Sequence, residues 1–107
     1  EGLNLIQGRV RRFSDPGLRV PHVGWNQIEG TRPNPLLKSV PEGTYFYFVH
    51  SYYVEPARSE YILRWTEYGR RFCSIACRDN VWGAQFHPEK SSSPGLRIIQ
   101  NFLEEIA

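Results

Sequence analysis

The sequence predicts an α/β protein that consists mostly of short β-strands and ends in a single α-helix. Glycine and proline residues divide most of the chain into short segments, nearly all of them rich in β-branched and aromatic residues. Residues 44–54, TYFYFVHSYYV, form the strongest of these segments, with the almost continuous aromatic run of a strand covered on both faces. Only the C-terminal segment has helical periodicity, with apolar residues at Leu96, Ile99, Leu103 and Ile106 and with Ile98 and Phe102 beside them.

The remaining elements follow in order along the chain. Strands or extended segments are predicted at residues 3–8, 9–13 and 18–29, and three more strands within residues 61–87. Turns are predicted at residues 14–17, 68–69 and 79–80. Asn34 followed by Pro35 is typical of the cap and first position of a short helical turn. Ser93 followed by Pro94 predicts the start of the C-terminal helix in the same way.

Length and composition indicate one small folded domain. The chain has 107 residues, of which 40% are hydrophobic and 14% aromatic, enough for a hydrophobic core. A net charge of +2 is too small to demand a nucleic-acid partner, and no apolar run is long enough to cross a bilayer. We therefore expect neither nucleic acid nor a membrane as a partner. The sequence begins at Glu1 and contains no methionine, from which we expect a fragment or a processed product.

Two cysteines, Cys73 and Cys77, occur in the segment RRFCSIACR. Along a strand their separation is about 13 Å, which is too long for a disulfide between them. No second Cys/His pair is nearby to complete a zinc site, so no metal site is predicted. We interpret both as small, half-buried residues in a reducing compartment, which indicates a cytoplasmic protein.

The hexapeptide QFHPEK places His87 and Glu89 on either side of Pro88. In an extended segment both side chains point to the same face, and the fixed φ of proline stiffens the step between them. The carboxylate can then reach the back of the imidazole, as the orienting acid does in a nucleophile–His–acid triad. The alternative is a strand end whose histidine and glutamate simply face solvent, since short motifs also occur by chance.

Five segments occur in the order found in a known family: GLNLIQGRV, VPHVGWNQ, FYFVHSYY, NVWGAQFHPEKSS and GLRIIQNF. Together they resemble the C-terminal half of the glutaminase subunits of imidazole glycerol phosphate synthase, which are triad glutamine amidotransferases of histidine biosynthesis. FHPEKS is typical of triad amidotransferases in general, and PHVGWNQ with FVHSYY narrows the resemblance to the histidine-pathway subunits. The resemblance covers essentially the whole chain. It implies that residues 1–107 are part of an α/β glutamine amidotransferase domain whose N-terminal half, with the nucleophile elbow, is absent.

The resemblance also implies a reaction. In this family a cysteine thiolate attacks the side-chain amide of glutamine, and a histidine moves the protons that release ammonia. His87 matches this histidine, and Glu89 matches the acid that orients it. No cofactor is implied. The ammonia passes to a barrel-shaped cyclase partner, which uses it to form imidazole glycerol phosphate.

Two further groups of residues are assigned by the resemblance. Ser51 and Tyr52 lie where the family holds glutamine, largely through backbone groups. The residues expected to face the cyclase partner are His22, Trp25, Asn26, Tyr47 and Lys90. Taken alone, PHVGWN also fits a bent edge strand with a buried tryptophan. For His50, a hydrogen-bonded core histidine is the interpretation favoured by the residue alone.

The nucleophile of the family lies in a glycine-flanked elbow between a strand and a helix, and nothing in this sequence has that form. Cys73 and Cys77 lie in a strand-like run without a flanking glycine. We therefore expect the chain to be inactive alone and to need an N-terminal half that carries the cysteine. One alternative is a non-catalytic binding module that retains only the partner-facing surface. Another is a nucleic-acid-binding domain, which would need base-stacking aromatic residues among its arginine-rich strands.

Overall fold

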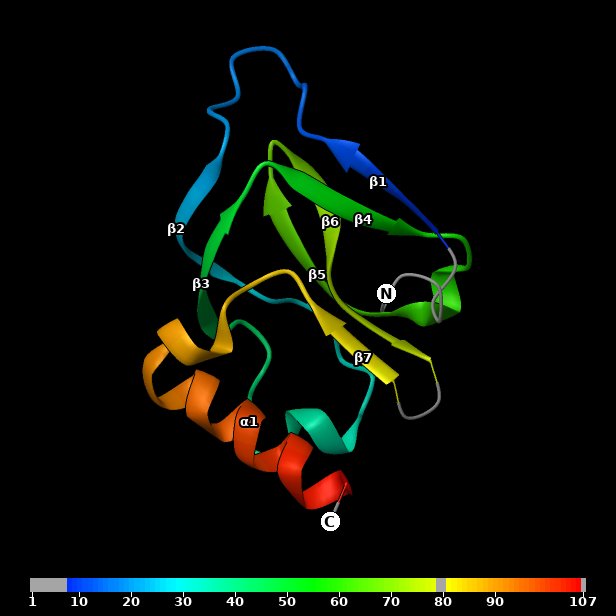
Figure 1. Cartoon of the computed structure of the whole chain (residues 1–107), viewed down its shortest axis with the longest axis vertical. Helices are drawn as coiled ribbons and strands as arrows, with labels where there is room; N and C mark the ends of the chain where they lie inside the picture. The colour runs from blue at the N-terminus through cyan, green and yellow to red at the C-terminus, as the bar shows by residue number, and fades with distance from the viewer. Residues whose placement is uncertain (1–7, 79–80, 107) are drawn as a thin grey trace.

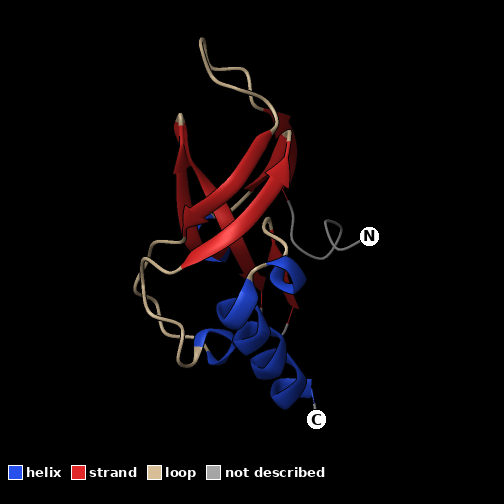
Figure 2. Cartoon of the chain, turned by 90° about the vertical axis from the view of Figure 1, so that its left-hand side faces the viewer, coloured by secondary structure: helices blue, strands red, loops and turns tan. Residues whose placement is uncertain are grey.

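The computed structural model describes residues 8–78 and 81–106, and it has the mostly-β architecture with one C-terminal helix that the sequence predicts. The strands form one end of the molecule, and the helix lies at the other end (Figures 1 and 2). The strands are β1 (Gly8–Arg12), β2 (His22–Gln27), β3 (Tyr45–His50), β4 (Tyr52–Pro56), β5 (Ile62–Tyr68), β6 (Arg70–Arg78) and β7 (Val81–Ala84). The helix is α1 (Ser92–Ile106), and short 3-10 turns are η2 (Pro35–Leu37), η3 (Ser59–Tyr61) and η4 (Pro88–Lys90).

The strand pairs among these residues are antiparallel, and they form three small sheets. β1 pairs with β4, β2 pairs with β3, and β5, β6 and β7 form a three-stranded sheet in that order. The register of β2 and β3 places Trp25 opposite Tyr47 and His22 opposite His50. Both of these cross-strand pairs belong to the candidate site described below.

The aromatic run at residues 44–54 is not the single strand that the sequence predicts. It breaks at Ser51, where β3 ends and β4 begins, and the two strands pair with different partners. The prediction that both faces are covered is also wrong, because Phe46 and Phe48 are fully buried while Tyr45 is 53% exposed. Aromatic residues suit a half-buried strand as well as a central one, so the composition of the run could not separate the two cases.

The prediction of three strands within residues 61–87 is confirmed by β5, β6 and β7. Gly69 makes the turn between β5 and β6 with a φ of 71°, a conformation that favours glycine. The sequence suggested that His87 lies at the end of a strand. In the structure β7 ends at Ala84, three residues before His87. The predicted turn at residues 79–80 lies outside the described residues.

Two of the extended segments predicted in the N-terminal part of the chain are present as strands, although the strands begin and end at other residues than predicted. The strand predicted at residues 9–13 corresponds to β1, and the extended segment at 18–29 contains β2 in its middle. The strand predicted at 3–8 lies outside the described residues except for its last one. The predicted helical turn is η2, in which Asn34 Oδ1 accepts the backbone N–H of Leu36 at 3.0 Å.

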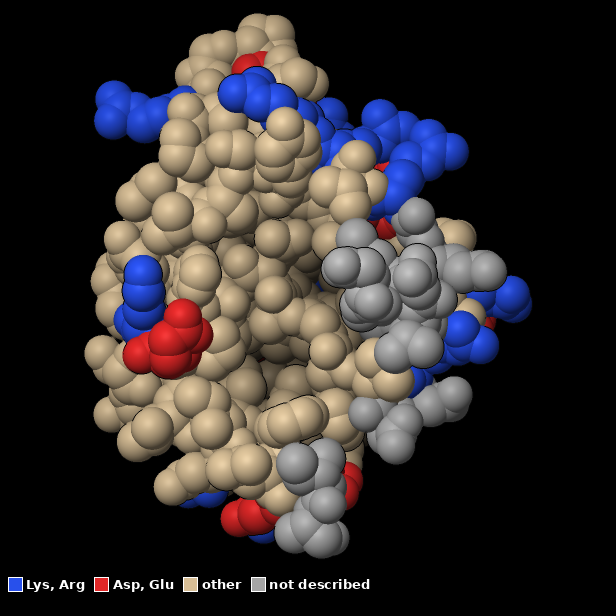
Figure 3. Space-filling view, in the orientation of Figure 1, with Lys and Arg blue, Asp and Glu red and all other residues tan. Residues whose placement is uncertain are grey.

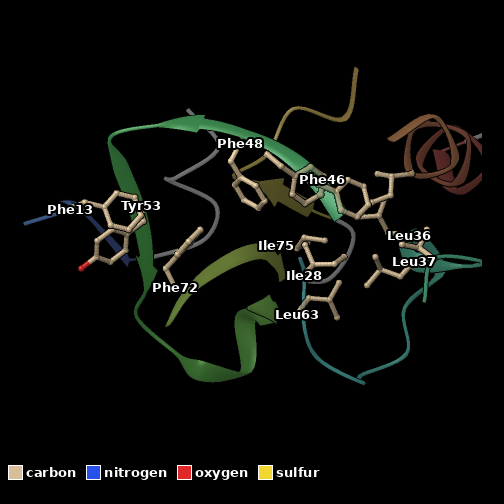
Figure 4. Packing of buried hydrophobic residues seen from close by; sticks show 13 residues of the cluster. Phe13, Ile28, Leu36, Leu37, Phe46, Phe48, Tyr53, Leu63, Phe72 and Ile75 are labelled. Carbon is tan, nitrogen blue, oxygen red and sulfur yellow. The ribbon is translucent and has the colours of Figure 1, made fainter. Parts of the chain in front are cut away.

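The hydrophobic core lies between the sheets and continues beneath α1 (Figure 4). Aromatic rings make up much of this core: Phe46 stacks on Phe86 with 4.3 Å between ring centroids, and Phe13 meets Phe72 edge-on at 5.5 Å. Aliphatic side chains complete the core, and those of Leu36 and Leu37 in η2 lie next to the helix. The aliphatic members of the core are Ile28, Leu36, Leu37, Val40, Leu63, Ile75 and Ile98.

The C-terminal helix is confirmed, and it begins at Ser92, one position before the predicted cap Ser93. Its buried residues include Gly95, Ile98 and Asn101, and the side-chain amide of Asn101 donates to the backbone carbonyls of Leu36 and Lys38 at 2.8 Å each. Much of its apolar stripe points outward instead. Three large apolar residues of α1 are exposed: Leu96 (60%), Phe102 (40%) and Leu103 (54%).

Candidate active site

His87 lies in the connection between β7 and α1, and its backbone is tied to β3. Its N–H donates to the carbonyl of Tyr47 at 2.9 Å. The fully buried Ser91 accepts the N–H of Tyr47 at 2.9 Å and donates its hydroxyl to the carbonyl of His87 at 2.6 Å. The two residues that flank η4, His87 and Ser91, are therefore both bonded to Tyr47 of β3.

The imidazole Nδ1 of His87 lies 3.0 Å from Oε2 of Glu89. The contact expected from the sequence is present, but the backbone between the two residues is a 3-10 turn and not the extended segment that the argument assumed. An ionised carboxylate only accepts hydrogen bonds, so Nδ1 carries the proton and Nε2 keeps a lone pair that can accept a proton. The two side chains are 39% and 60% exposed, which leaves the imidazole accessible to a substrate.

Glu89 remains ionised near neutral pH. Its own backbone N–H, in the first turn of η4, has the largest effect and lowers the pKa of the carboxyl group. The hydrogen bond from His87 lowers this pKa further, and the charge of Lys90 contributes in the same direction. The turn therefore keeps a carboxylate beside the imidazole without burying it.

A second pair of histidines lies behind the break between β3 and β4. Nδ1 of His22 is 2.9 Å from Nε2 of His50, and Nδ1 of His50 is 2.8 Å from the carbonyl oxygen of Tyr52. Burial is the main reason that the pKa of His22 falls to about 4, and the neighbouring His50 lowers it further. Burial also lowers the pKa of His50, so both rings are neutral at pH 7. For His50, a hydrogen-bonded histidine is what the sequence favoured, but its partner was not foreseen.

Ser51 and Tyr52, expected to hold glutamine, lie at the break between β3 and β4. The carbonyl oxygen of Ser51 accepts the N–H of Phe13 at 3.0 Å, and the side chain of Tyr52 is 53% exposed. Beyond the break, the N–H of Val54 donates to Oε1 of Gln85 at 3.1 Å, a residue of the segment that leads to His87. β4, which follows the expected substrate residues, is thus bonded directly to the segment that leads to His87.

The outer side of the β2–β3 pair is apolar and exposed. Trp25 is 49% exposed and meets Tyr47 edge-on at 5.9 Å, and Lys90 is exposed in η4. Alternation along the two strands adds three exposed residues that the motif comparison missed: Val23 (56%), Tyr45 (53%) and Val49 (39%). Val23 lies opposite Val49, and the face over β2 and β3 has few charged side chains (Figure 3). We call these five residues of β2 and β3 the outer face; the period-two pattern of each strand was the signal that could have found it.

Two residues expected to face a partner lie on the other side of β2. His22 is only 3% exposed because its ring is stacked between Phe48 and Tyr68, so it cannot offer a surface to another protein. Asn26 points to the same side, where its amide donates to the carbonyl oxygen of Glu67 at 2.9 Å. The motif was assigned to the partner as a block, whereas successive residues of a strand point to opposite faces.

Comparison with known proteins identifies the family. Residues 8–106 match the sequence model of the family Glutamine amidotransferase class-I. The chain belongs to this family. Within it, the chain is 50% identical over 102 residues to the imidazole glycerol phosphate synthase subunit HisH of Desulfitobacterium hafniense (strain DSM 10664 / DCB-2), covering 95% of this chain and 48% of that protein.

Two other proteins of the same name are similarly close to this class-I amidotransferase chain. The one from Gloeobacter violaceus is 51% identical over 109 residues, covering 99% of this chain and 48% of the relative. The one from Methanosarcina mazei is 49% identical over 106 residues, covering 97% of this chain and 52% of the relative. The chain therefore spans about half the length of the curated relatives it matches.

Cys73 of this amidotransferase chain does not have the environment of a nucleophile. Cys73 is 5% exposed, and burial raises the pKa of its thiol to about 12, which disfavours the thiolate. Cys77 is half-buried and lies 3.7 Å from the side-chain amide of Asn34. Among residues 8–78 and 81–106, no three His, Cys, Asp or Glu side chains come together as a metal site requires. No helix in the same described part of the chain is long and apolar enough to cross a membrane.

Proposed function

We propose that this chain supplies the histidine–acid pair of a glutaminase, the HisH subunit of imidazole glycerol phosphate synthase. The observation that carries the proposal is the 3.0 Å contact between His87 Nδ1 and Glu89 Oε2, in a chain about 50% identical to proteins of that name. The carboxylate holds the proton on Nδ1, which directs Nε2 toward the reacting groups. Glutamine is the substrate, and the products are glutamate and ammonia.

The reaction requires a cysteine from an N-terminal half. Nε2 of His87 takes the thiol proton, and the thiolate attacks the side-chain amide carbon of glutamine. The protonated imidazole then donates to the leaving nitrogen, and ammonia departs as a thioester remains. Water hydrolyses the thioester to glutamate and returns the thiol. No cofactor takes part in these steps.

Two observations support an N-terminal half as part of the same protein. The chain covers 48–52% of the relatives named above, and α1 exposes Leu96, Phe102 and Leu103. Exposed apolar residues on one helix are typical of a surface that another element covers. We infer that residues 1–107 are the C-terminal part of one amidotransferase domain and that they have no glutaminase activity alone.

The outer face of β2 and β3 is the part of the chain that we assign to the cyclase. Aromatic residues such as Trp25 and Tyr47 are enriched in protein interfaces, and Lys90 adds one positive charge beside them. In this proposal the cyclase and this subunit form a heterodimer in the cytoplasm. Ammonia then passes from the glutaminase to the cyclase in the step of histidine biosynthesis that forms imidazole glycerol phosphate.

Replacement of His87 in the complete subunit tests the proposal. With the cyclase present, His87→Ala should lower the rate of ammonia release by about a thousandfold, because general acid–base catalysis is lost. Glutamine binding should remain largely intact. Retained turnover in the variant would contradict the assignment. Mass spectrometry of the purified protein decides whether a cysteine-bearing N-terminal half is present. If it is absent, the chain has no nucleophile and could act only as a binding module.

A further inference from the structure

The neutral pair of His22 and His50 has no part in the reaction steps given above. The two histidines are part of a series of hydrogen bonds that begins at Asn26 and ends at the backbone of Tyr52. Nδ2 of Asn26 lies 3.3 Å from Nε2 of His22, Nδ1 of His22 lies 2.9 Å from Nε2 of His50, and Nδ1 of His50 lies 2.8 Å from the carbonyl oxygen of Tyr52. We call these four residues the relay.

The acceptor at the end of the relay determines the position of every proton in it. The carbonyl oxygen of Tyr52 can only accept, and at 2.8 Å it is much closer to Nδ1 of His50 than the amide nitrogen of Gln85 at 3.4 Å. Nδ1 of His50 therefore carries a proton and its Nε2 carries a lone pair. That lone pair requires a proton on Nδ1 of His22, and the remaining nitrogen of His22 accepts from the amide of Asn26. The N–H of Gln27 donates to Oδ1 of Asn26 at 2.8 Å, which orients the amide nitrogen toward His22. Both imidazoles therefore satisfy both of their nitrogens without a charge.

Aromatic rings hold the relay in place. The ring of His22 is stacked on Tyr68 at 3.9 Å and on Phe48 at 4.9 Å, and the residue is 3% exposed. The ring of Phe13 meets His50 edge-on at 5.2 Å. Rotation of the buried His22 ring would break its part-buried hydrogen bond to His50, and water has little access to the His22 ring to replace it.

The relay ends on the backbone segment that we propose for glutamine binding. The carbonyl oxygen of Ser51 is already held by the N–H of Phe13 at 3.0 Å, and the relay holds the next carbonyl, that of Tyr52. Because a peptide unit is planar, fixing a carbonyl also fixes the N–H of the following residue. The two bonds together determine the orientation of two successive peptide units at the break between β3 and β4.

We propose that His22 and His50 are positioning residues for glutamine: they hold the carbonyl of Tyr52, and with it the peptide unit between Tyr52 and Tyr53, so that the Ser51–Tyr52 segment keeps the orientation that binds the substrate. The inference rests on the proposed function. His22 acts at a distance, through His50, and neither imidazole exchanges a proton with the substrate. The relay begins on β2, which carries part of the outer face. Side-chain hydrogen bonds therefore join this strand to the substrate segment.

Two substitutions of His22 in the complete subunit, assayed with the cyclase, separate positioning from general stability. His22→Phe keeps a ring between Phe48 and Tyr68 but removes the donor to His50. It should raise the KM for glutamine about tenfold while kcat changes less than about twofold, as expected for loss of one part-buried hydrogen bond. His22→Asn places an amide N–H near the position of Nδ1 and should restore most of the affinity.

Thr66→Val is the matched control. Thr66 is fully buried and its hydroxyl donates to the carbonyl of Gln27 at 2.9 Å, so the variant loses one hydrogen bond between β5 and β2 outside the relay. It should lower stability to a similar extent as His22→Phe but leave the KM for glutamine unchanged. An equal rise of KM in both variants, or no rise in His22→Phe, would overturn the inference.

A second measurement keeps the inference testable if His22→Phe does not fold. Two-bond ¹H–¹⁵N spectra of the imidazoles in the unmodified subunit should show both His22 and His50 with the proton on Nδ1. A proton on Nε2 of His50 would overturn the relay. Neither the spectra nor the KM ratio depends on whether His87 is the catalytic base. An active His87→Ala variant would therefore contradict the proposed function, whereas an unchanged KM together with an inactive His87→Ala would contradict only the relay.

Discussion

Gly95 of α1 packs directly against the carbonyl of Pro88, between the two residues of the candidate histidine–acid pair. A Cβ atom at position 95 would overlap the carbonyl oxygen of Pro88 and lie 2.8 Å from its carbonyl carbon and 2.9 Å from Cβ of Ser91. Only a residue without a side chain permits this approach. The helix therefore supports the turn that carries His87 and Glu89 from behind.

Gly95→Ala should destabilise the protein, although replacing glycine by alanine inside a helix ordinarily increases stability by about 1 kcal/mol. The new methyl group must displace the backbone of η4, and such overpacking costs about 1–3 kcal/mol. We expect a lower urea midpoint together with reduced glutaminase activity in the complete subunit. Ser93→Ala, at an exposed position of the same helix, is the control and should change neither quantity. A stabilised Gly95→Ala variant would show that η4 and α1 are not in this contact.

Glu89→Gln should reduce activity far more than stability. The pair with His87 is exposed to solvent, and exposed pairs of this kind contribute little to folding. The neutral amide no longer stabilises the imidazolium, so ammonia release should fall by at least about tenfold. Glu60→Gln is the matched control, because Glu60 also lies in a 3-10 turn and its side chain is 67% exposed. Equal activities of the two variants would argue against an orienting role for Glu89.

Asn101→Ala should be among the most destabilising single changes in α1. The side chain is 1% exposed and its amide donates to the carbonyls of Leu36 and Lys38. Its loss leaves two acceptors without these bonds and costs about 2–3 kcal/mol. Chemical denaturation of the complete subunit measures the effect, and Gln100→Ala, at the neighbouring exposed position, should be nearly neutral. A small effect at Asn101 would mean that α1 is held mainly by its apolar contacts.

Stability should fall as the pH is lowered from 6.5 toward 4, in part because of His22. The pKa of His22 is about 4 in the folded protein, below the ordinary value of 6.5, so the unfolded chain binds more protons across this interval. The ionisable side chains that contact its ring are His50 and Tyr68. Glu89 also loses its stabilising effect in acid, since its pKa is lowered too. The contribution of His22 is therefore the difference in pH slope between the unmodified protein and His22→Phe; identical slopes would contradict it.

The local parts of the structure could be predicted from the sequence. The Asn34 cap, the Gly69 turn and the helical period of residues 92–106 each depend on neighbours a few residues apart. The same holds for the contact of His87 with Glu89, although a 3-10 turn and not an extended segment brings them together. The assignment of the PHVGWNQ motif failed at His22, because the motif was treated as one surface although its residues alternate between two faces.

The sequence by itself determined the strands, the final helix and a histidine with a carboxylate beside it, because these follow from residue type and short spacing. Only the tertiary structure decided that the aromatic run breaks at Ser51 and that His22 meets His50. These features depend on which strands pair and in what register, and the register joins residues far apart in the chain. Burial then decided the protonation of both histidines, since the charge state of an imidazole depends on the environment that the fold creates.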